Sequence, residues 1–280
     1  MNFGKLKIEK FRPENMAENP AIVLIAKRGS GKSWVIRDLM YQLNSIPCGA
    51  VISPTDRVNS FYKRFFPDIY IHYEIKPEIM EKILVRQKKM TKKQEDKKKK
   101  GLKIDRSAIL VMDDCLSQKG KWEKDPSIKE ILMNGRHYGL TYILTMQTPL
   151  GVTPDLRLNF DYVFLLKEDS NINKKKLYEN YASMFSNLKV FDSVFTSCTK
   201  DFATMVIDNR KPGDKPQDKV YWFKAKKRRF MFGSKEFRDI HNKCYDPDFM
   251  LKGINDNYAG SRLFGKTKGN EVEIQIMKVQ

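Results

Sequence analysis

Short, continuous apolar runs alternate with amphipathic segments along this 280-residue chain. The apolar runs predict buried β-strands at residues 21–26, 49–53, 108–114, 142–147, 161–166 and 219–223. Apolar residues at helical spacing predict helices at residues 35–43, 77–84, 128–133 and 234–244. Strands that alternate with helices favour an α/β fold, in which helices cover both faces of a mainly parallel sheet.

Two of the predicted strands end in polar side chains. Asp113 and Asp114 close the strand at 108–114, and Gln147 closes the strand at 142–147. Open α/β sheets bind ligands at the carboxyl ends of their strands. We therefore expect these three side chains to meet at one ligand site.

A glycine-rich loop follows the strand at 21–26 and leads directly into a predicted helix. This phosphate loop, residues 27–33, reads Lys27-Arg28-Gly29-Ser30-Gly31-Lys32-Ser33. Its backbone N–H groups can surround a triphosphate, Lys32 can reach the β- and γ-phosphates, and Ser33 can place its hydroxyl on Mg²⁺. The following helix adds the partial positive charge of its N-terminus. A similar run also occurs in solvated turns, but the flanking strand and helix favour binding of ATP and Mg²⁺.

Ala26 stands where the usual pattern of such loops has its first glycine. Alanine is acceptable there if the backbone keeps a negative φ, because Gly29 and Gly31 remain for the tighter part of the loop. We therefore expect the substitution to be tolerated.

The polar strand ends fit the chemistry of phosphoryl transfer. Asp113 can hold Mg²⁺, and Asp114 can orient or deprotonate an attacking water. Gln147 can sense the γ-phosphate and position that water, because an amide both donates and accepts hydrogen bonds. The structural alternatives are an Asp-Asp turn without a role and a glutamine that only ends a strand.

One arginine is a candidate for neutralising charge in the transition state. Arg136 lies in a turn, Asn134-Gly-Arg-His137, ahead of the strand at 142–147. As an arginine finger it would act on the site of a neighbouring subunit. The alternative is an arginine that faces the C-terminal dipole of a helix. Arg157 is a second candidate for the finger.

The charge of the chain suggests a polyanionic partner. With 53 Lys and Arg against 34 Asp and Glu, the formal net charge is +19. Four scattered cysteines and three histidines form no metal-binding pattern, so we expect reduced thiols, buried or half-buried. No apolar run is long enough to span a membrane, and a secretory signal is not evident, which favours a soluble intracellular protein.

Basic residues gather in two segments, 86–103 and 224–229. The first is either a solvated lysine run or a loop that contacts DNA phosphates without reading bases. In the second, some side chains can cover apolar surface, and Phe230 and Phe232 could stack on unpaired bases.

Taken together, these blocks resemble the genome-packaging ATPases of poxviruses and other large nucleocytoplasmic DNA viruses, in the FtsK–HerA group of P-loop motors. The similarity covers about residues 20–225. The blocks that carry it are Lys27–Ser33, Ile109–Asp114, Asn134–His137, Leu144–Gln147 and Leu156–Asp161.

The resemblance implies a RecA/FtsK-like P-loop NTPase fold and a homo-oligomeric ring that translocates double-stranded DNA into a capsid. It also implies capsid or portal proteins as partners, and a location in viral factories of the host cytoplasm or in the virion. Gln147 is then the γ-phosphate sensor and Arg136 a finger acting in trans.

We expect one ATPase domain at residues 1–250, with a lysine-rich insertion at about 86–103, and a C-terminal tail at 251–280. Other functions remain open at this point: a helicase or DNA-transfer ATPase, a nucleotide kinase, or a basic core protein without activity. Unwinding of a forked duplex would favour a helicase, and ATPase activity indifferent to DNA would favour a kinase.

Overall fold

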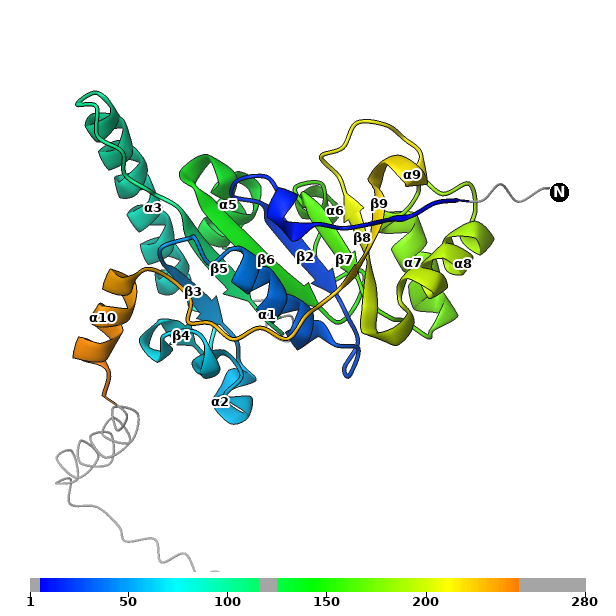
Figure 1. Cartoon of the computed structure of the whole chain (residues 1–280), viewed down its shortest axis with the longest axis horizontal. Helices are drawn as coiled ribbons and strands as arrows, with labels where there is room; N and C mark the ends of the chain where they lie inside the picture. The colour runs from blue at the N-terminus through cyan, green and yellow to red at the C-terminus, as the bar shows by residue number, and fades with distance from the viewer. Residues whose placement is uncertain (1–5, 116–124, 247–280) are drawn as a thin grey trace, which may run out of the picture. The chain divides into compact units, whose positions relative to one another are not determined.

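A computed structural model of the chain describes residues 6–115 and 125–246, and nine strands within these ranges pair in one sheet (Figure 1). The strands are β1 (Glu9–Lys10), β2 (Ala21–Ile25), β3 (Gly49–Ile52), β4 (Ile71–His72), β5 (Ala108–Met112), β6 (Leu140–Met146), β7 (Tyr162–Leu165), β8 (Ala203–Asp208) and β9 (Val220–Lys224). Their order is β1-β9-β8-β7-β2-β6-β5-β3-β4. β8 runs antiparallel to both of its neighbours, and the other pairs are parallel. The predicted α/β fold with a mainly parallel sheet is confirmed.

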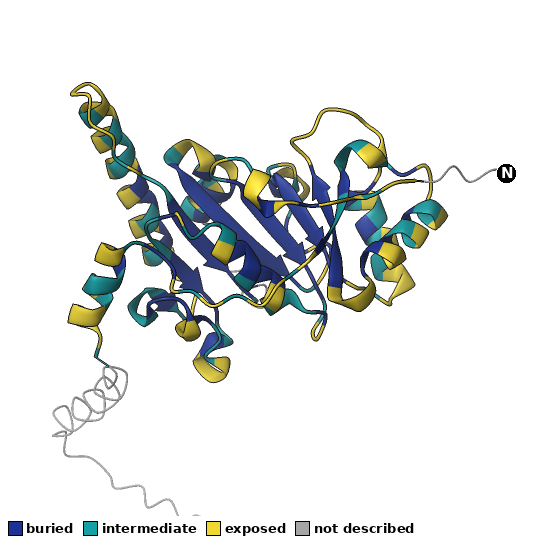
Figure 2. Cartoon of the chain, in the orientation of Figure 1, coloured by how far each residue is buried: buried dark blue, intermediate teal, exposed yellow. Residues whose placement is uncertain are grey.

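The central strands are buried on both faces, as their continuous apolar sequences predict (Figure 2). Side chains of a strand alternate between the faces. In β2, Ile22 and Leu24 therefore join one apolar core, whereas Val23 and Ile25 join the other. The sheet thus separates two hydrophobic layers.

Helices supply the outer side of each layer. The helices are α1 (Lys32–Gln42), α2 (Asp56–Asn59), α3 (Pro77–Lys98), α5 (Pro126–Asn134), α6 (Pro154–Arg157), α7 (Asn171–Tyr181), α8 (Leu188–Cys198), α9 (Pro216–Lys219) and α10 (Lys235–Cys244). Short 3-10 turns are η1 (Pro13–Asn15), η2 (Tyr62–Arg64), η3 (Asp68–Tyr70), η5 (Gly135–Tyr138) and η6 (Lys200–Phe202). α3, α5, α6, α7 and α8 pack on one face, and α1 and α10 pack on the other.

Three strands are absent from the sequence prediction. β1 and β4 have two residues each and lie at the sheet edges, so no hydrophobic pattern marks them. β8 is a fully buried run that the periodicity could have revealed. Its antiparallel direction brings its first residue, Ala203, beside Lys224 at the end of β9.

The lysine-rich segment is helical over most of its length. The predicted loop conformation is therefore wrong, whereas contact of this segment with DNA stays a prediction. α3 continues from Pro77 to Lys98. The buried Gln87 donates from Nε2 to the carbonyl oxygens of Arg106 (3.0 Å) and Tyr138 (2.9 Å), which lie shortly before β5 and β6 begin. Gln87 therefore lies at the end of the sheet where β5 and β6 begin, which we call the amino edge of the sheet. The lysine-rich second half of α3 extends beyond that end (Figure 1).

The internal contacts divide the chain into a unit at Met1–Asn242 and a second at Lys243–Gln280. The predicted tail at 251–280 lies outside the described residues, so its boundary stays a prediction. Within the described ranges, no helix has the length and apolar character needed to cross a lipid bilayer.

Candidate active site

The phosphate loop connects β2 to α1 in a conformation that needs its glycines. Gly29 and Gly31 have φ angles of 76° and 95°, in the left-handed region that disfavours other residues. The Ser30 hydroxyl donates to the carbonyl oxygen of Lys27 (2.7 Å), and α1 begins at Lys32. Ala26 is buried and lacks a positive φ, as expected for an alanine at this position.

A cleft of about 1060 Å³ opens beside this loop. Its lining includes most of the predicted site residues, namely Lys27, Arg28, Gly29, Gly31, Lys32, Ser33, Asp113, Asp114 and Gln147. Lys27 also forms an ion pair with Asp169. These residues therefore converge on one cleft, as expected from the sequence, and their binding of a ligand stays a prediction.

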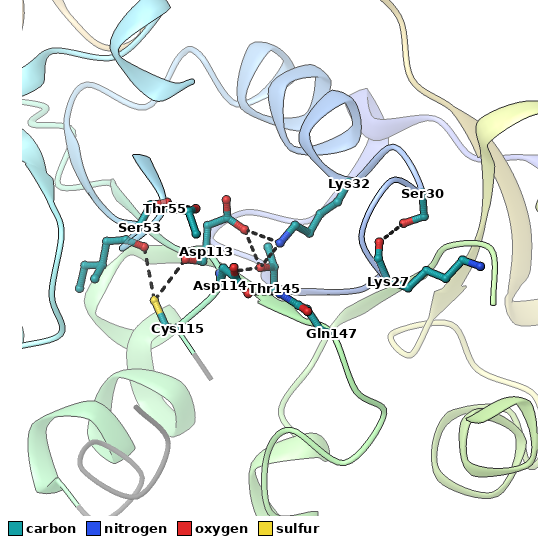
Figure 3. Close-up of polar contacts among 11 residues, drawn as sticks. Lys27, Ser30, Lys32, Ser53, Thr55, Asp113, Asp114, Cys115, Thr145 and Gln147 are labelled. Carbon is teal, nitrogen blue, oxygen red and sulfur yellow. Dashed lines mark hydrogen bonds and ion pairs between the residues drawn. The ribbon is translucent and has the colours of Figure 1, made fainter. Parts of the chain in front are cut away.

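Lys32 and Asp113 both line the cleft, and their side chains point toward one another (Figure 3). The ammonium of Lys32 lies 3.0 Å from Oδ1 of Asp113, whose side chain is almost fully buried. The hydroxyl of Thr145 donates to the same carboxylate oxygen at 2.6 Å and lies 3.4 Å from the Lys32 ammonium. A buried carboxylate is thus stabilised by one cation and one hydroxyl.

Thr145 is a site residue that the sequence analysis missed. It has no exposed surface, and its oxygen also accepts a hydrogen bond from the backbone N–H of Asp114 at 3.0 Å. It therefore fixes both neighbouring aspartates. The available signal was a threonine two residues before Gln147, near the carboxyl end of the strand.

Asp114 and Gln147 form the second polar pair of the site. Nε2 of Gln147 donates to Oδ1 of Asp114 (Figure 3). Asp114 has a φ of 56°, a left-handed conformation that Asp and Asn adopt more readily than most residues. Asp114 is half-buried and lines the cleft.

The residues predicted to bind Mg²⁺ fit an ion of this kind. Ser33 lies in the first turn of α1, lines the cleft, and its hydroxyl makes no hydrogen bond to another described residue. Asp113 lines the same cleft and provides carboxylate oxygens. Mg²⁺ prefers such oxygen ligands and usually keeps several waters. The donor set is therefore suitable for Mg²⁺.

Two further titratable groups lie beneath Asp113. Burial, together with the Asp113 carboxylate, raises the pKa of Tyr62 well above its ordinary value. Burial and the carboxylates of Asp113 and Asp114 also raise the pKa of the Cys115 thiol. Both groups stay protonated near neutral pH, so neither provides an anionic nucleophile.

The arginines predicted as fingers lie away from this cleft. Arg136, in η5, is placed just before β6 begins, at the amino edge of the sheet. Its guanidinium lies 3.5 Å from Oδ1 of the buried Asp161, as does that of Arg210. Arg157, at the end of α6, is half-buried and interacts with Tyr181. Neither arginine lines the cleft beside the phosphate loop of its own chain, so a finger would have to act on another subunit.

The basic segment 224–229 lies along α1. Asp38 accepts hydrogen bonds from Nε of Arg228 and from the backbone N–H of Lys226, both at 2.7 Å. Phe232 is buried against Phe66, and Phe230 packs on Tyr41 and Phe65. The interpretation that Phe232 stacks on unpaired bases is therefore wrong, because its ring is buried. Phe230 is half-buried, so base stacking by this ring stays a prediction.

All four cysteines lie in the described residues, and none of them forms a disulfide bond. Cys48 is half-buried, and Cys115 and Cys198 are buried, as expected. Cys244 is exposed, which the expectation of buried or half-buried thiols did not include.

Comparison with known proteins places the chain among viral proteins. The family model described as "Poxvirus A32 protein" matches residues 8–218. The uncharacterized protein L437 of Acanthamoeba polyphaga mimivirus is 56% identical over 276 residues, which cover 99% of this chain and 97% of the relative. The uncharacterized protein 015R of Frog virus 3 (isolate Goorha) is 33% identical over 227 residues, covering 79% and 68%.

Among solved structures, the fold is similar to that of B204, the DNA-packaging ATPase from Sulfolobus turreted icosahedral virus. The TM-score is 0.53 at 18% sequence identity, and the match covers 76% of this chain and 100% of that chain. This likeness confirms the predicted P-loop NTPase fold. Together with the family match, it confirms the resemblance predicted from the sequence blocks: the chain belongs to the poxvirus A32 protein family.

Proposed function

We propose that this protein is an ATP-hydrolysing motor that translocates double-stranded viral DNA into a capsid. The observation that carries the proposal is the meeting of Lys32, Asp113, Asp114 and Gln147 in the cleft beside the phosphate loop. Family membership and the fold shared with B204, a protein described as a DNA-packaging ATPase, support genome packaging over a helicase or a kinase.

In this proposal the triphosphate of ATP binds on the phosphate loop, and Lys32 contacts its β- and γ-phosphates. Ser33 and Asp113 would hold Mg²⁺, which neutralises phosphate charge when bound. Thr145 keeps the Asp113 carboxylate oriented through the 2.6 Å hydrogen bond described above.

The hydrolytic step is assigned to Asp114 and Gln147. The Asp114 carboxylate accepts a proton from the attacking water, and the Gln147 side chain holds that carboxylate in position. The Gln147 side-chain oxygen accepts no hydrogen bond from another described residue, so it can orient the same water. A change at the γ-phosphate would thus reach β6 through Gln147.

The second half of α3 is the proposed DNA-binding element. Its exposed lysines, including Lys89, Lys92 and Lys93, extend beyond the amino edge of the sheet, where they can contact phosphates without reading bases. A motor needs such sequence-independent contacts because it moves along all sequences. The net charge of +19 agrees with a polyanionic partner.

We further propose a homo-oligomeric ring with Arg136 acting on the neighbouring subunit, and capsid or portal proteins as partners. Support for the ring comes from the position of Arg136, which is remote from the cleft of its own chain. Viral factories of the host cytoplasm, or the virion, are the corresponding location.

The test is ATP turnover by the full-length protein with and without Mg²⁺, compared with the variant Asp114→Asn. We expect Mg²⁺-dependent hydrolysis that the variant loses while it still binds ATP. Asparagine tolerates the left-handed backbone at this position, so the variant should fold. Wild-type protein that binds but never hydrolyses ATP would contradict the proposal.

A second experiment distinguishes packaging from a helicase. Translocation on intact duplex DNA, without unwinding of a forked duplex, would favour packaging.

A further inference from the structure

The cleft extends from Asp113 and Asp114, on one side of β2, to residues on the other side of β2. β6 and β5 lie on one flank of β2 and carry Gln147, Asp113 and Asp114 at their ends. β7, β8 and β9 lie on the other flank. If the γ-phosphate faces the aspartates, the nucleoside end of the nucleotide faces the start of β8 and the end of β9.

An exposed aromatic ring lies on that second flank. Phe202 directly precedes β8, lines the cleft, and is 69% exposed. It lies close to the phosphate loop, since a Cβ added at Gly31 would be 3.4 Å from its Cδ1 atom. The ring therefore lies close enough to the phosphate loop to contact the base of a nucleotide whose phosphates bind there.

The backbone that presents this ring is unfavourable for an aromatic residue such as Phe202. Asp201 and Phe202 have φ angles of 52° and 60°, two consecutive non-glycine residues in the left-handed region. Burial of the ring within the chain does not explain the conformation, because the ring is mostly exposed. A ligand that covers the ring would explain it.

The segment after β9 forms a fixed wall of the same cleft. Lys224 lies opposite Ala203 in the β8–β9 register, and Lys224, Ala225 and Lys227 line the cleft. The two hydrogen bonds from Lys226 and Arg228 to Asp38 hold this segment on α1. A flat group stacked on Phe202 would thus contact residues 224–227, whose position these hydrogen bonds already fix.

We propose that Phe202 stacks on the base of the bound nucleoside triphosphate, in a subsite bounded by the segment 224–227. The inference rests on the proposed function, since it requires the triphosphate on the phosphate loop. Every nucleobase has a π-face that stacks on an aromatic ring, and a purine offers a larger one than a pyrimidine. The subsite therefore favours purine nucleotides.

The test is the affinity of full-length Phe202→Ala for ATP, CTP and inorganic tripolyphosphate, measured by calorimetry. We expect binding of ATP to weaken by about tenfold or more, binding of CTP to weaken less, and binding of tripolyphosphate to stay unchanged. Phe202→Tyr keeps the aromatic face and should bind ATP like the wild type. Ile172→Ala is the matched control, because Ile172 is also 69% exposed but does not line the cleft.

Two results would overturn the base contact while leaving the proposed function intact. One is unchanged ATP affinity of Phe202→Ala, and the other is an equal loss of ATP and tripolyphosphate binding, which would mean that the ring supports the loop. A wild-type protein that binds neither ATP nor tripolyphosphate would overturn the proposed function, and the inference would fail with it.

Discussion

The ammonium of Lys32 lies 3.0 Å from Oδ1 of Asp113, although the two residues follow strands that are not neighbours in the sheet. β6 lies between β2 and β5 and contributes Thr145 to the same carboxylate oxygen. Residues at or after the ends of three adjacent strands are thus joined by one ion pair and one hydrogen bond. Since the lysine-rich half of α3 lies at the opposite edge of the sheet, these residues and this helix can be altered separately.

Replacing Lys32 with alanine should abolish ATP hydrolysis, because the β- and γ-phosphates lose their cation. DNA binding should persist, since the lysine-rich half of α3 lies at the amino edge of the sheet. ATPase assays and DNA-binding titrations at one salt concentration measure the two activities separately. Loss of both activities in a folded variant would contradict their separation.

Thr145→Val should lower the hydrolysis rate by about 10- to 100-fold while the protein remains folded, because Asp113 loses the hydroxyl that orients it. The matched control is Thr141→Val in the same strand. Thr141 is equally buried, and its hydroxyl has no hydrogen-bond partner among the described residues. Steady-state ATPase rates and thermal melting check both variants. Equal rates in the two variants would remove Thr145 from the site.

Arg136→Ala and Arg210→Ala distinguish a finger from a structural ion pair. Both guanidinium groups lie 3.5 Å from Oδ1 of Asp161, and both side chains are 41% exposed. Each variant leaves one arginine on Asp161, so similar stability is expected. If Arg136 acts in trans, only Arg136→Ala should lose activity, by about 10³-fold or more.

The readout is the ATPase rate of each assembled variant at equal melting temperature. Mixing Arg136→Ala with Lys32→Ala should restore part of the activity, because an intact Arg136 can then face an intact phosphate loop. Equal rates for Arg136→Ala and Arg210→Ala would show that Arg136 only supports the amino edge of the sheet.

Neutralising Lys89, Lys92 and Lys93 together with glutamine should weaken binding to duplex DNA of any sequence. The slope of log K against log salt concentration should become shallower by roughly three, about one for each lysine that no longer neutralises a phosphate. The triple glutamine variant of Lys211, Lys215 and Lys235 removes the same charge from other exposed positions and is the control. An equal effect of both triple variants would mean that net charge alone, and not α3, attracts DNA.

Much of the site could be predicted because its residues occupy strand ends. In a parallel sheet the carboxyl ends of the strands share one edge, so Asp113, Asp114 and Gln147 were expected to converge from the sequence pattern alone. The glycines of the phosphate loop were informative for the same local reason, since a positive φ restricts the residue type.

Other features depend on contacts between distant segments, which local patterns do not encode. Thr145 looks like an ordinary strand residue until Asp113 lies beside it. The conformation of α3 was ambiguous because lysines suit both a helix and a solvated loop, and the contacts of Gln87 with the carbonyls of Arg106 and Tyr138 are long-range. Likewise, the burial of Phe232 required the partner ring of Phe66.

The central claim, a nucleotide-driven DNA motor, is tested most directly by the ATPase rate of the full-length protein with and without double-stranded DNA across a salt series. The account predicts strong stimulation by DNA at low salt that declines as salt increases, because the contacts are made to phosphates. A rate that does not respond to DNA at any salt concentration would contradict it.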